Sequence, residues 1–568
     1  MARGEALRLL IIGIDGADHL LTQRLMADGD LPNLCRLTRR GACGPLRSTT
    51  PPTTPPAWTS IMTGKSPGRH GVYDFLPMSG DAMETPIASR RRATTVWRAL
   101  SDAGLRVGTF NLPATYPPEV LSGFQISGFD GPSYQPSLAE PREAFAVLDK
   151  AVGEYDLCPL SIQDPEGDRD ALVRHADLPV IGSKALLARF PCDVYMTSFQ
   201  IVDWVHHGHL GREMRPMQPE SLAPDGHVRE AYRLVDDRVG DLLSAAADAG
   251  TNVIILSDHG GAAADRLVNL EKLFLERGLM AYGSRSGGDA GGLEARRSRA
   301  AQALGLWMRV KQALPAVARV LGPVARRLRS RLASYQRDVQ IDWSRTRAAP
   351  WGDYAQVRLN IAGRDPEGIV PPGEADALAA EVEDLILSVQ DPGTGERLFA
   401  EVLRNEQLYD GPFSHLGPDL YARPAEERCV TVSARPGIST LPLSDVQPEP
   451  VVALEPPWGV HSSVGIIAMA GPSVGQRCEI TDAGVEDMTP TALHMLGQPI
   501  PLDLDGRVLT EALSAELAAA SPQRCAPWPP PERVTDAGYS DAEREAVERR
   551  LRHLGYMGRA QGRSVKMT

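Results

Sequence analysis

The chain has 568 residues, enough for one large α/β domain with insertions or for about two to four smaller domains. A hydrophobic content of 42% supports a sizeable core, and a formal net charge of −12 argues against nucleic acid as the main partner. The seven cysteines form no Cys-x-x-Cys pair, which argues against a disulfide framework or a zinc–thiolate cluster and predicts a reducing, cytoplasmic location. No apolar stretch is long enough to span a bilayer, so we expect no transmembrane segment.

The first predicted element is the aliphatic run Leu9–Ile14, which is typical of a central parallel strand. It ends in Asp15 and Gly16, so a carboxylate lies where open α/β sheets place their sites. Residue patterns then predict helices over 18–28, 31–40 and 96–103 and a strand over 106–112.

Residues 45–75 are rich in proline and threonine and then turn into a predicted helix at Ala57-Trp58-Thr59. Thr53 and Thr54 therefore lie at a loop-to-helix junction, where backbone N–H groups and the helix dipole favour an anion. A threonine here is either a nucleophile for a phosphoryl group or an ordinary cap or turn residue. This stretch alone leaves both interpretations open.

Two further strands are predicted over 193–199 and 252–256, and both lead into polar residues. Asp203 and His207 follow the first and are four residues apart, so they share a face on a helical turn. Asp258 and His259 follow the second. Three strands ending in acidic loops predict an α/β fold with a doubly wound, mostly parallel central sheet flanked by helices and with one composite site.

The predicted domain organisation is a core divided by one insertion. We expect residues 1–270 to form the first part of the core with a loop-rich insertion at about 127–180, 271–340 a basic helical insertion or cap, 341–521 the second part of the core, and 522–568 a linker and terminal helix. Residues 296–337 carry ten Arg and one Lys without an acidic residue. This segment is a cap that attracts an anionic substrate, a peripheral membrane contact, or a solvated helical insertion.

The second part of the core is expected to return to the same sheet over 342–361. Further predictions are helices over 374–389, 489–496 and 541–554, a loop over 435–457 and a strand over 466–470.

Aspartate and histidine recur in four places that suit Zn²⁺ or Mn²⁺ better than Ca²⁺ or Mg²⁺. The candidate ligands are Asp15, Asp203, His207, Asp258, His259 and His461. Taken singly, each has an ordinary interpretation as a helix cap, a surface pair, a turn or a loop histidine. The set as a whole indicates two metal ions.

The order of these motifs resembles the alkaline phosphatase superfamily, and most closely its type I phosphodiesterase and nucleotide pyrophosphatase branch. The motifs are a strand ending in Ile-Asp-Gly, Thr-x-Pro-x-x-Trp-Thr-Ser-Ile-x-Thr-Gly, Asp-x-x-x-His, Ser-Asp-His-Gly and Gly-x-His. The resemblance implies that Asp203, His207 and His461 hold one metal ion. It also implies that Asp15, Asp258 and His259 hold the other together with Thr54, which stands ten residues before Gly64. His206 and His209 are then neighbours of these ligands and not ligands themselves.

The chemistry implied by this resemblance is that of a two-metal phosphohydrolase. The Thr54 hydroxyl, activated by a divalent cation, attacks phosphorus and forms a phospho-threonine intermediate that water hydrolyses. The substrate is a phosphorylated small molecule, a diester or a monoester. A phosphomutase or phosphotransferase on the same core, and a non-catalytic anion- or lipid-binding protein, are the alternatives.

One departure from the family pattern concerns the substrate. Nucleotide pyrophosphatases usually carry an asparagine shortly after the His-Gly pair, but here Val72-Tyr73-Asp74-Phe75 follows Gly71. An ionised Asp74 is not a donor, so the motif predicts phosphoester chemistry more firmly than a nucleotide substrate. Trp58 and Asp74 are the candidate substrate contacts.

Overall fold

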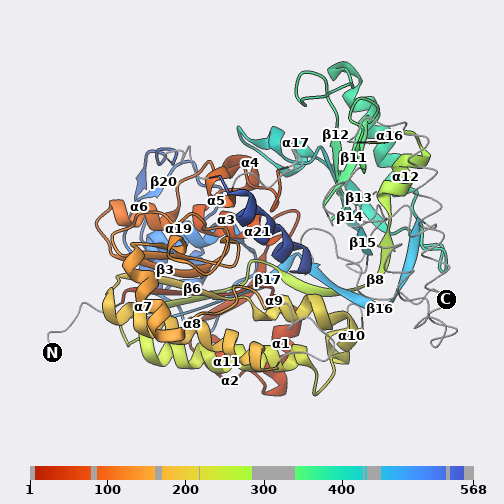
Figure 1. Ribbon diagram of the computed structural model, residues 1–568. Coiled ribbons are helices and arrows are strands. Elements are labelled where there is room, and N and C mark those ends of the chain that lie inside the picture. The colour runs from red at the N-terminus through yellow and green to blue at the C-terminus, as the bar shows by residue number, and fades with distance from the viewer. Residues whose placement is uncertain are drawn as a thin grey trace.

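The structure is a computed structural model that describes residues 7–77, 86–159, 169–215, 218–284, 339–352, 354–425, 429–431, 450–531 and 538–554 (Figure 1). The basic segment 296–337 lies outside these residues, so its predicted role is not addressed by the structure. In the part of the chain that is described, no helix is both long enough and apolar enough to cross a membrane.

A large sheet forms the centre of the molecule. Its middle strand is β1 (Leu9–Ile14), which pairs in parallel with β6 (Val194–Phe199) on one side and β7 (Asn252–Leu256) on the other. The full order is β18-β2-β17-β7-β1-β6-β3-β4-β5, with β19 also paired to β2. The other strands are β2 (Ala42–Arg47), β3 (Val107–Leu112), β4 (Phe124–Ser127), β5 (Ala139–Glu140), β17 (Val464–Ala470), β18 (Cys478–Glu479) and β19 (Ala483–Gly484).

Helices cover both faces of this sheet (Figure 1). One face carries α1 (His19–Asp28), α2 (Pro32–Arg40), α7 (Arg142–Val152), α8 (Arg169–Arg189) and α11 (His227–Ala246). The other face carries α3 (Thr54–Thr63), α6 (Val96–Asp102) and α19 (Met488–Met495). The predicted doubly wound α/β architecture with a mostly parallel sheet is therefore confirmed.

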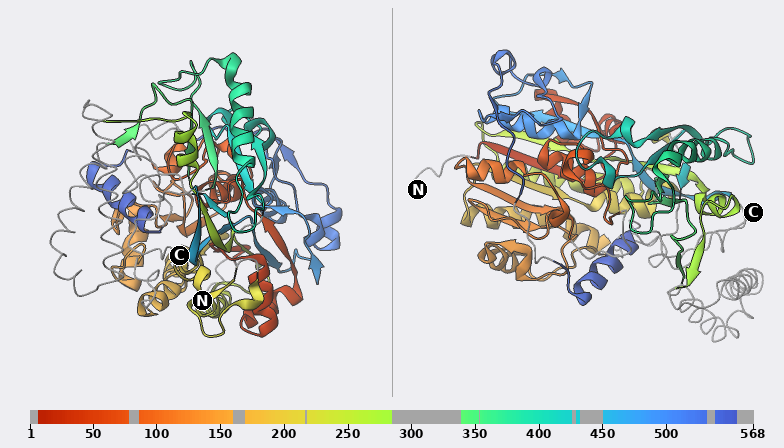
Figure 2. Two further views of the ribbon diagram at one scale, coloured as in Figure 1. Left: turned by 90° about the vertical axis from the view of Figure 1, so that its right-hand side faces the viewer. Right: turned by 90° about the horizontal axis from the view of Figure 1, so that it is seen from above.

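A second, smaller unit with its own apolar core stands beside the central sheet (Figure 2). Its antiparallel sheet contains β11 (Ala348–Trp351), β12 (Gln356–Leu359), β14 (Leu420–Pro424) and β13 (Phe399–Arg404), packed with α12 (Leu270–Glu276) and α16 (Ala375–Leu387). We call this unit the small subdomain. The prediction that 342–361 returns to the central sheet is wrong, because β11 and β12 pair with each other and with β14.

A three-stranded sheet links the two units. It consists of β15 (Cys429–Thr431), β8 (Gly260–Val268) and β16 (Val451–Ser462). The predicted loop over 435–457 is wrong for residues 451–457, which belong to β16, and residues 432–449 lie outside the described part.

Two other predictions concern the flanking regions. The interval 127–180 contains α7 and about half of α8, and both helices pack against the core. Its described part is therefore more helical than the loop-rich insertion that the sequence predicts. The domain boundaries stay a prediction. The terminal helix α21 (Asp541–Leu554) forms as expected and buries Val547 and Leu551.

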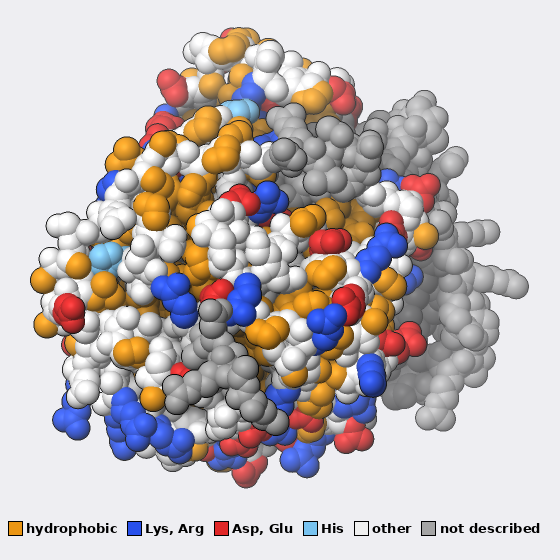
Figure 3. Space-filling view, turned by 90° about the vertical axis from the view of Figure 1, so that its left-hand side faces the viewer, with side chains coloured by type: hydrophobic (Ala, Val, Ile, Leu, Met, Phe, Trp, Pro, Cys, Tyr) orange, Lys and Arg blue, Asp and Glu red, His pale blue; other side chains and the backbone are white. Residues whose placement is uncertain are grey.

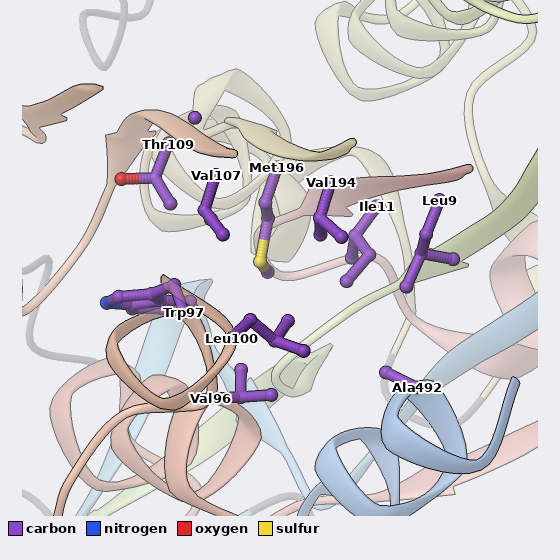
Figure 4. Close-up of a pocket in the computed structure, with 11 residues that line it drawn as sticks. Leu9, Ile11, Val96, Trp97, Leu100, Val107, Thr109, Val194, Met196 and Ala492 are labelled. Atoms are coloured by element: carbon purple, nitrogen blue, oxygen red, sulfur yellow. The ribbon is translucent and has the colours of Figure 1, made fainter. Parts of the chain in front are cut away.

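A small cavity lies between α6 and the central sheet (Figure 4). Its lining is almost entirely apolar and includes Leu9, Ile11, Trp97, Leu100, Val107 and Met196. On the outside, the face shown in Figure 3 has basic and acidic side chains interspersed among the described residues, so the negative net charge is not gathered there.

Candidate metal centre and active site

The candidate site lies at the edge of the sheet where β7, β1 and β6 end. Asp15 directly follows β1, and its amide donates to the carbonyl of Phe199 at the end of β6 (2.9 Å). Asp258 and His259 follow β7, and Asp203 lies in the short helix α9 (Ile201–Val205) after β6. Because β17 runs antiparallel to β7, its first residue lies at the same edge, and β16 delivers His461 there.

The first cluster contains the aspartate and two of the histidines that the sequence grouped together. Asp203 Oδ1 lies 3.4 Å from His207 Nε2 and 3.3 Å from His461 Nε2, and the two Nε2 atoms are 3.1 Å apart. One ligand atom from each residue can therefore face a single ion.

The second cluster surrounds His259. Its Nε2 lies 3.5 Å from Asp15 Oδ1, 3.3 Å from Asp258 Oδ2 and 3.3 Å from the Thr54 hydroxyl oxygen. Asp203 also lies within reach of Asp15 and His259, so its carboxylate stands between the two clusters. The His259 and His461 rings stack with centroids 3.7 Å apart, which joins the clusters into one centre.

Backbone carbonyls orient the two stacked imidazoles. His461 Nδ1 lies 2.8 Å from the carbonyl oxygen of Pro52, and His259 Nδ1 lies 2.9 Å from that of Gly260. A ring nitrogen beside a carbonyl oxygen carries the proton, so the unprotonated Nε2 of each ring faces the cluster. Partners of this kind fix the tautomer that a metal ligand requires.

The carboxylates of this centre are buried and incompletely paired. Among the described residues, Asp15 Oδ1 and Asp258 Oδ2 accept no hydrogen bond, although both side chains are at most 1% exposed. Burial, with the nearby Asp203 carboxylate adding to it, raises the pKa of Asp258 to about 7. Burial and repulsion from Asp258 also raise the pKa of Asp15 well above its ordinary value.

Asp203 and the imidazoles of the centre also shift one another's pKa values. Burial acts to raise the pKa of Asp203, but His207 and His461 outweigh it and hold that pKa below the ordinary value. Burial and the neighbouring His461 lower the pKa of His259 well below its usual range. Burial acts to lower the pKa of His461, but Asp203 outweighs it and raises that pKa, so the metal-free centre holds a proton between these two groups. Buried carboxylates and imidazoles crowded in this way are ligands that a pair of divalent cations would satisfy.

Thr54 is the first residue of α3 and is completely buried. Pro55 and Pro56 follow it, so two of the first helical positions have no N–H group. This weakens the expectation that the helix N-terminus itself binds an anion through its amides. The position of Thr54 beside His259 is the stronger feature.

Trp58, which the sequence suggested as a substrate contact, is also completely buried. Its indole Nε1 donates to Asp15 Oδ2 (3.2 Å). Gly13 makes room for the ring, because a Cβ there would lie 2.2 Å from the indole. Gly16 has φ +76° and lies so close to Asp203 that a Cβ would be 2.8 Å from the Cβ of that residue.

The remaining sequence candidates lie beside the centre or apart from it. His206 is buried, packs on Tyr232, and has a pKa that burial lowers to about 4. His209 faces Glu213 instead of the two clusters. Asp74 is buried and accepts a hydrogen bond from the amide of Phe75 (2.6 Å).

Two tyrosines of the small subdomain reach this region without any signal in the sequence. Tyr354 packs on the His461 ring at 5.6 Å, and its hydroxyl accepts from the His461 amide (3.3 Å). Tyr409 is buried and donates to the carbonyl of Thr50 (2.6 Å), in the loop that leads to Thr54. Only the folded arrangement of both units reveals these contacts.

Comparison with known families fits this geometry. The family model of type I phosphodiesterases and nucleotide pyrophosphatases matches residues 9–437. The chain belongs to this family. It is therefore a member of the alkaline phosphatase superfamily and of a group of hydrolases that act on phosphodiester and pyrophosphate bonds.

The match begins at the first residue of β1 and covers five of the six candidate metal ligands. His461 lies beyond it, so in this type I phosphodiesterase family member its assignment rests on the contacts with Asp203 and His207. A comparison with curated proteins gives no match.

Proposed function

We propose that the protein is a two-metal phosphohydrolase that cleaves a phosphodiester or phosphomonoester bond of a small molecule through Thr54. The observation that carries this proposal is the buried Thr54 hydroxyl, 3.3 Å from His259 Nε2. The same ring nitrogen lies 3.3 Å from Asp258 Oδ2 and 3.5 Å from Asp15 Oδ1. Thr54 is not the helix cap, because Thr53 occupies the N-cap position, and the Thr53 side chain makes no cap hydrogen bond.

The residues fit two divalent cations, most simply Zn²⁺, with Mn²⁺ as the other choice. Asp203, His207 and His461 would hold one ion, and Asp15, Asp258 and His259 the other, with Thr54 beside it. When bound, such ions lower the pKa of a neighbouring hydroxyl and stabilise charge on the attacking and leaving oxygens.

Thr54 supplies the nucleophile in this proposal. Its oxygen loses the proton and forms a bond to phosphorus, while the bond from phosphorus to the leaving alkoxide breaks. Water then cleaves the phospho-threonine ester and regenerates the hydroxyl. Trp58 acts as a positioning residue for Asp15, since its side chain is buried and donates to that carboxylate.

The substrate in this proposal is a phosphorylated small molecule, which need not be a nucleotide. Asp74 replaces the usual amide donor, and its Oδ1 accepts from a backbone amide within its own turn. Recognition of the nonbridging oxygens then falls to other groups. Asp74 therefore stays only a candidate substrate contact, and a panel of substrates would test it.

The test is hydrolysis of bis-p-nitrophenyl phosphate and of a panel of mono- and diesters by protein loaded with Zn²⁺ or Mn²⁺. Thr54→Ala should abolish turnover, whereas Thr54→Ser should retain part of it. Thr53→Ala is the matched control, because the Thr53 hydroxyl is buried and has no hydrogen-bond partner in the part of the chain that the structure describes. Loss of activity in Thr53→Ala with activity preserved in Thr54→Ala would overturn the assignment.

The same assay separates hydrolysis from transfer. A phosphohydrolase transfers the phosphoryl group to water and turns over without any added acceptor, so inorganic phosphate or a monoester accumulates. A phosphotransferase or phosphomutase would move the group to an acceptor and would need that acceptor for turnover.

A further inference from the structure

A second group of metal-ligand side chains lies close to the proposed centre along the chain but shares no residue with it. His209 comes from the π-helical turn η3 (His206–Leu210), Glu213 ends α10 (Gly211–Glu213), and His227 begins α11. Glu213 Oε1 lies 3.7 Å from His209 Nδ1 and 3.3 Å from His227 Nδ1. We call these three residues the His209 cluster.

The Glu213 carboxylate is held in place by the start of α11. Its Oε1 accepts from the amide of His227 and its Oε2 from that of Val228, both at 2.9 Å. Gly226 permits this approach, because a Cβ there would lie 2.2 Å from Oε2. The side chain is 11% exposed, so the carboxylate is a fixed anion at the edge of the interior.

Both histidines turn Nδ1 toward Glu213 Oε1, and the His227 contact, at 3.3 Å, is within hydrogen-bond distance. The His209 Nδ1 contact of 3.7 Å is longer than a hydrogen bond, and Oε1 already accepts from a backbone amide. The two imidazoles stack at 4.1 Å with an angle of 26° between them, and both direct Nδ1 to the same oxygen. A tetrahedral zinc ion with ligand bonds of about 2.0–2.1 Å separates its ligand atoms by about 3.4 Å, close to both spacings.

We propose that His209, Glu213 and His227 bind a third divalent cation, Zn²⁺, with water completing the coordination. Two imidazole nitrogens and one carboxylate oxygen form a donor set that Zn²⁺ favours. The ligand atoms lie within 4.8 Å of one another, and the 38% exposed side chain of His227 gives the ion access from solvent.

The role of this ion is structural. It ties η3, which carries His207, to the N-terminus of α11 and so holds one ligand of the catalytic centre in position. The proposal gives a role to His209, which the sequence places only as a neighbour of the catalytic ligands. It does not depend on the proposed function, since none of its ligands belongs to the two clusters around Asp203 and His259.

The test is the zinc content of the full-length protein after saturation with Zn²⁺ and removal of loose metal by gel filtration. His227→Ala should carry one equivalent of zinc per chain less than the wild type. His415→Ala, which removes an exposed histidine of the small subdomain, is the control and should match the wild type. Equal zinc in His227→Ala and wild type would overturn the proposal.

A second variant guards against an indirect effect of the first. Glu213→Gln keeps an oxygen that can accept from one α11 amide but removes the charge, and it should lose the same single equivalent. Asp258→Asn should instead reduce the metal of the catalytic centre and keep the equivalent that depends on His227. If the zinc lost in Asp258→Asn and in His227→Ala is the same equivalent, the third site does not exist.

Discussion

The strands β1 and β6 carry two contrasting regions within a few residues. Before their carboxyl ends, Leu9, Ile11 and Met196 face α6 across an apolar cavity (Figure 4). At their carboxyl ends lie the buried carboxylates of Asp15 and Asp203 with their imidazole neighbours. The apolar region stabilises the fold, because its side chains are removed from water. The charged region destabilises the metal-free fold, because its carboxylates are buried close together. Stability and chemistry are thus separated along the same strands.

The largest effect is expected at the charged end. Asp258→Asn should lower the turnover of a phosphodiester by more than ~100-fold, because a ligand of the second cluster is weakened. The same change removes one of three crowded carboxylates and should raise the thermal stability of the metal-free protein. Activity assays and thermal unfolding in the presence of a chelator would measure both effects. A parallel fall in activity and in metal-free stability would contradict the comparison.

The cavity region should behave in the opposite way. Leu100 is 2% exposed and lines the cavity, so Leu100→Ala should lower the free energy of unfolding by about 2–5 kcal/mol. Metal content and kcat per folded molecule should be unchanged. Denaturant unfolding and metal analysis would check this. A loss of bound metal per folded molecule would show that the two regions are coupled.

A pair of tryptophans allows a sharper test of the separation. Trp58→Phe removes the donor to Asp15 and should weaken metal binding by about 10–100-fold. Trp97→Phe is matched in size and burial, but its indole N–H has no partner in the described structure. Both variants should lose similar stability, and only Trp58→Phe should show the change in metal titrations. Equal metal affinity in the two variants would remove the positioning role of Trp58.

The smallest effect is expected at the contact between the small subdomain and the nucleophile loop. Tyr409→Phe leaves the Thr50 carbonyl without its donor, at a cost of about 1–3 kcal/mol. We expect kcat to fall several-fold with little change in KM, because the loop that carries Thr54 is less well fixed. Tyr73→Phe removes a comparable bond, from Tyr73 to the Phe413 carbonyl, and should not alter kcat.

The parts of the fold that could be predicted from the sequence are those with strong local patterns. The aliphatic runs that became β1, β6 and β7 are continuous because these strands are buried on both faces, and each ends at a charged motif. The convergence of Asp15, Asp203 and Asp258 then follows from parallel pairing, since neighbouring parallel strands end at one edge.

The failures have equally physical causes. Residues 451–457 contain Pro456 and Pro457 and were predicted as a loop, yet β16 accommodates them through an irregular register opposite β8. The β11 and β12 strands were assigned to the wrong sheet, because a strand pattern does not specify its partner. Tertiary contacts form the hydrogen bond from Trp58 to Asp15 and bring together the His209 cluster. Local sequence patterns do not predict such contacts.

The central claim is that the Thr54 hydroxyl becomes covalently attached to the substrate phosphorus. The most direct measurement is peptide mass spectrometry of zinc-loaded protein, acid-quenched during turnover of a phosphate ester. We predict a phosphoryl adduct on the peptide that contains Thr54, present in Thr53→Ala and absent in Thr54→Ala. Full turnover with no adduct at any time point, or an adduct that persists in Thr54→Ala, would contradict this account.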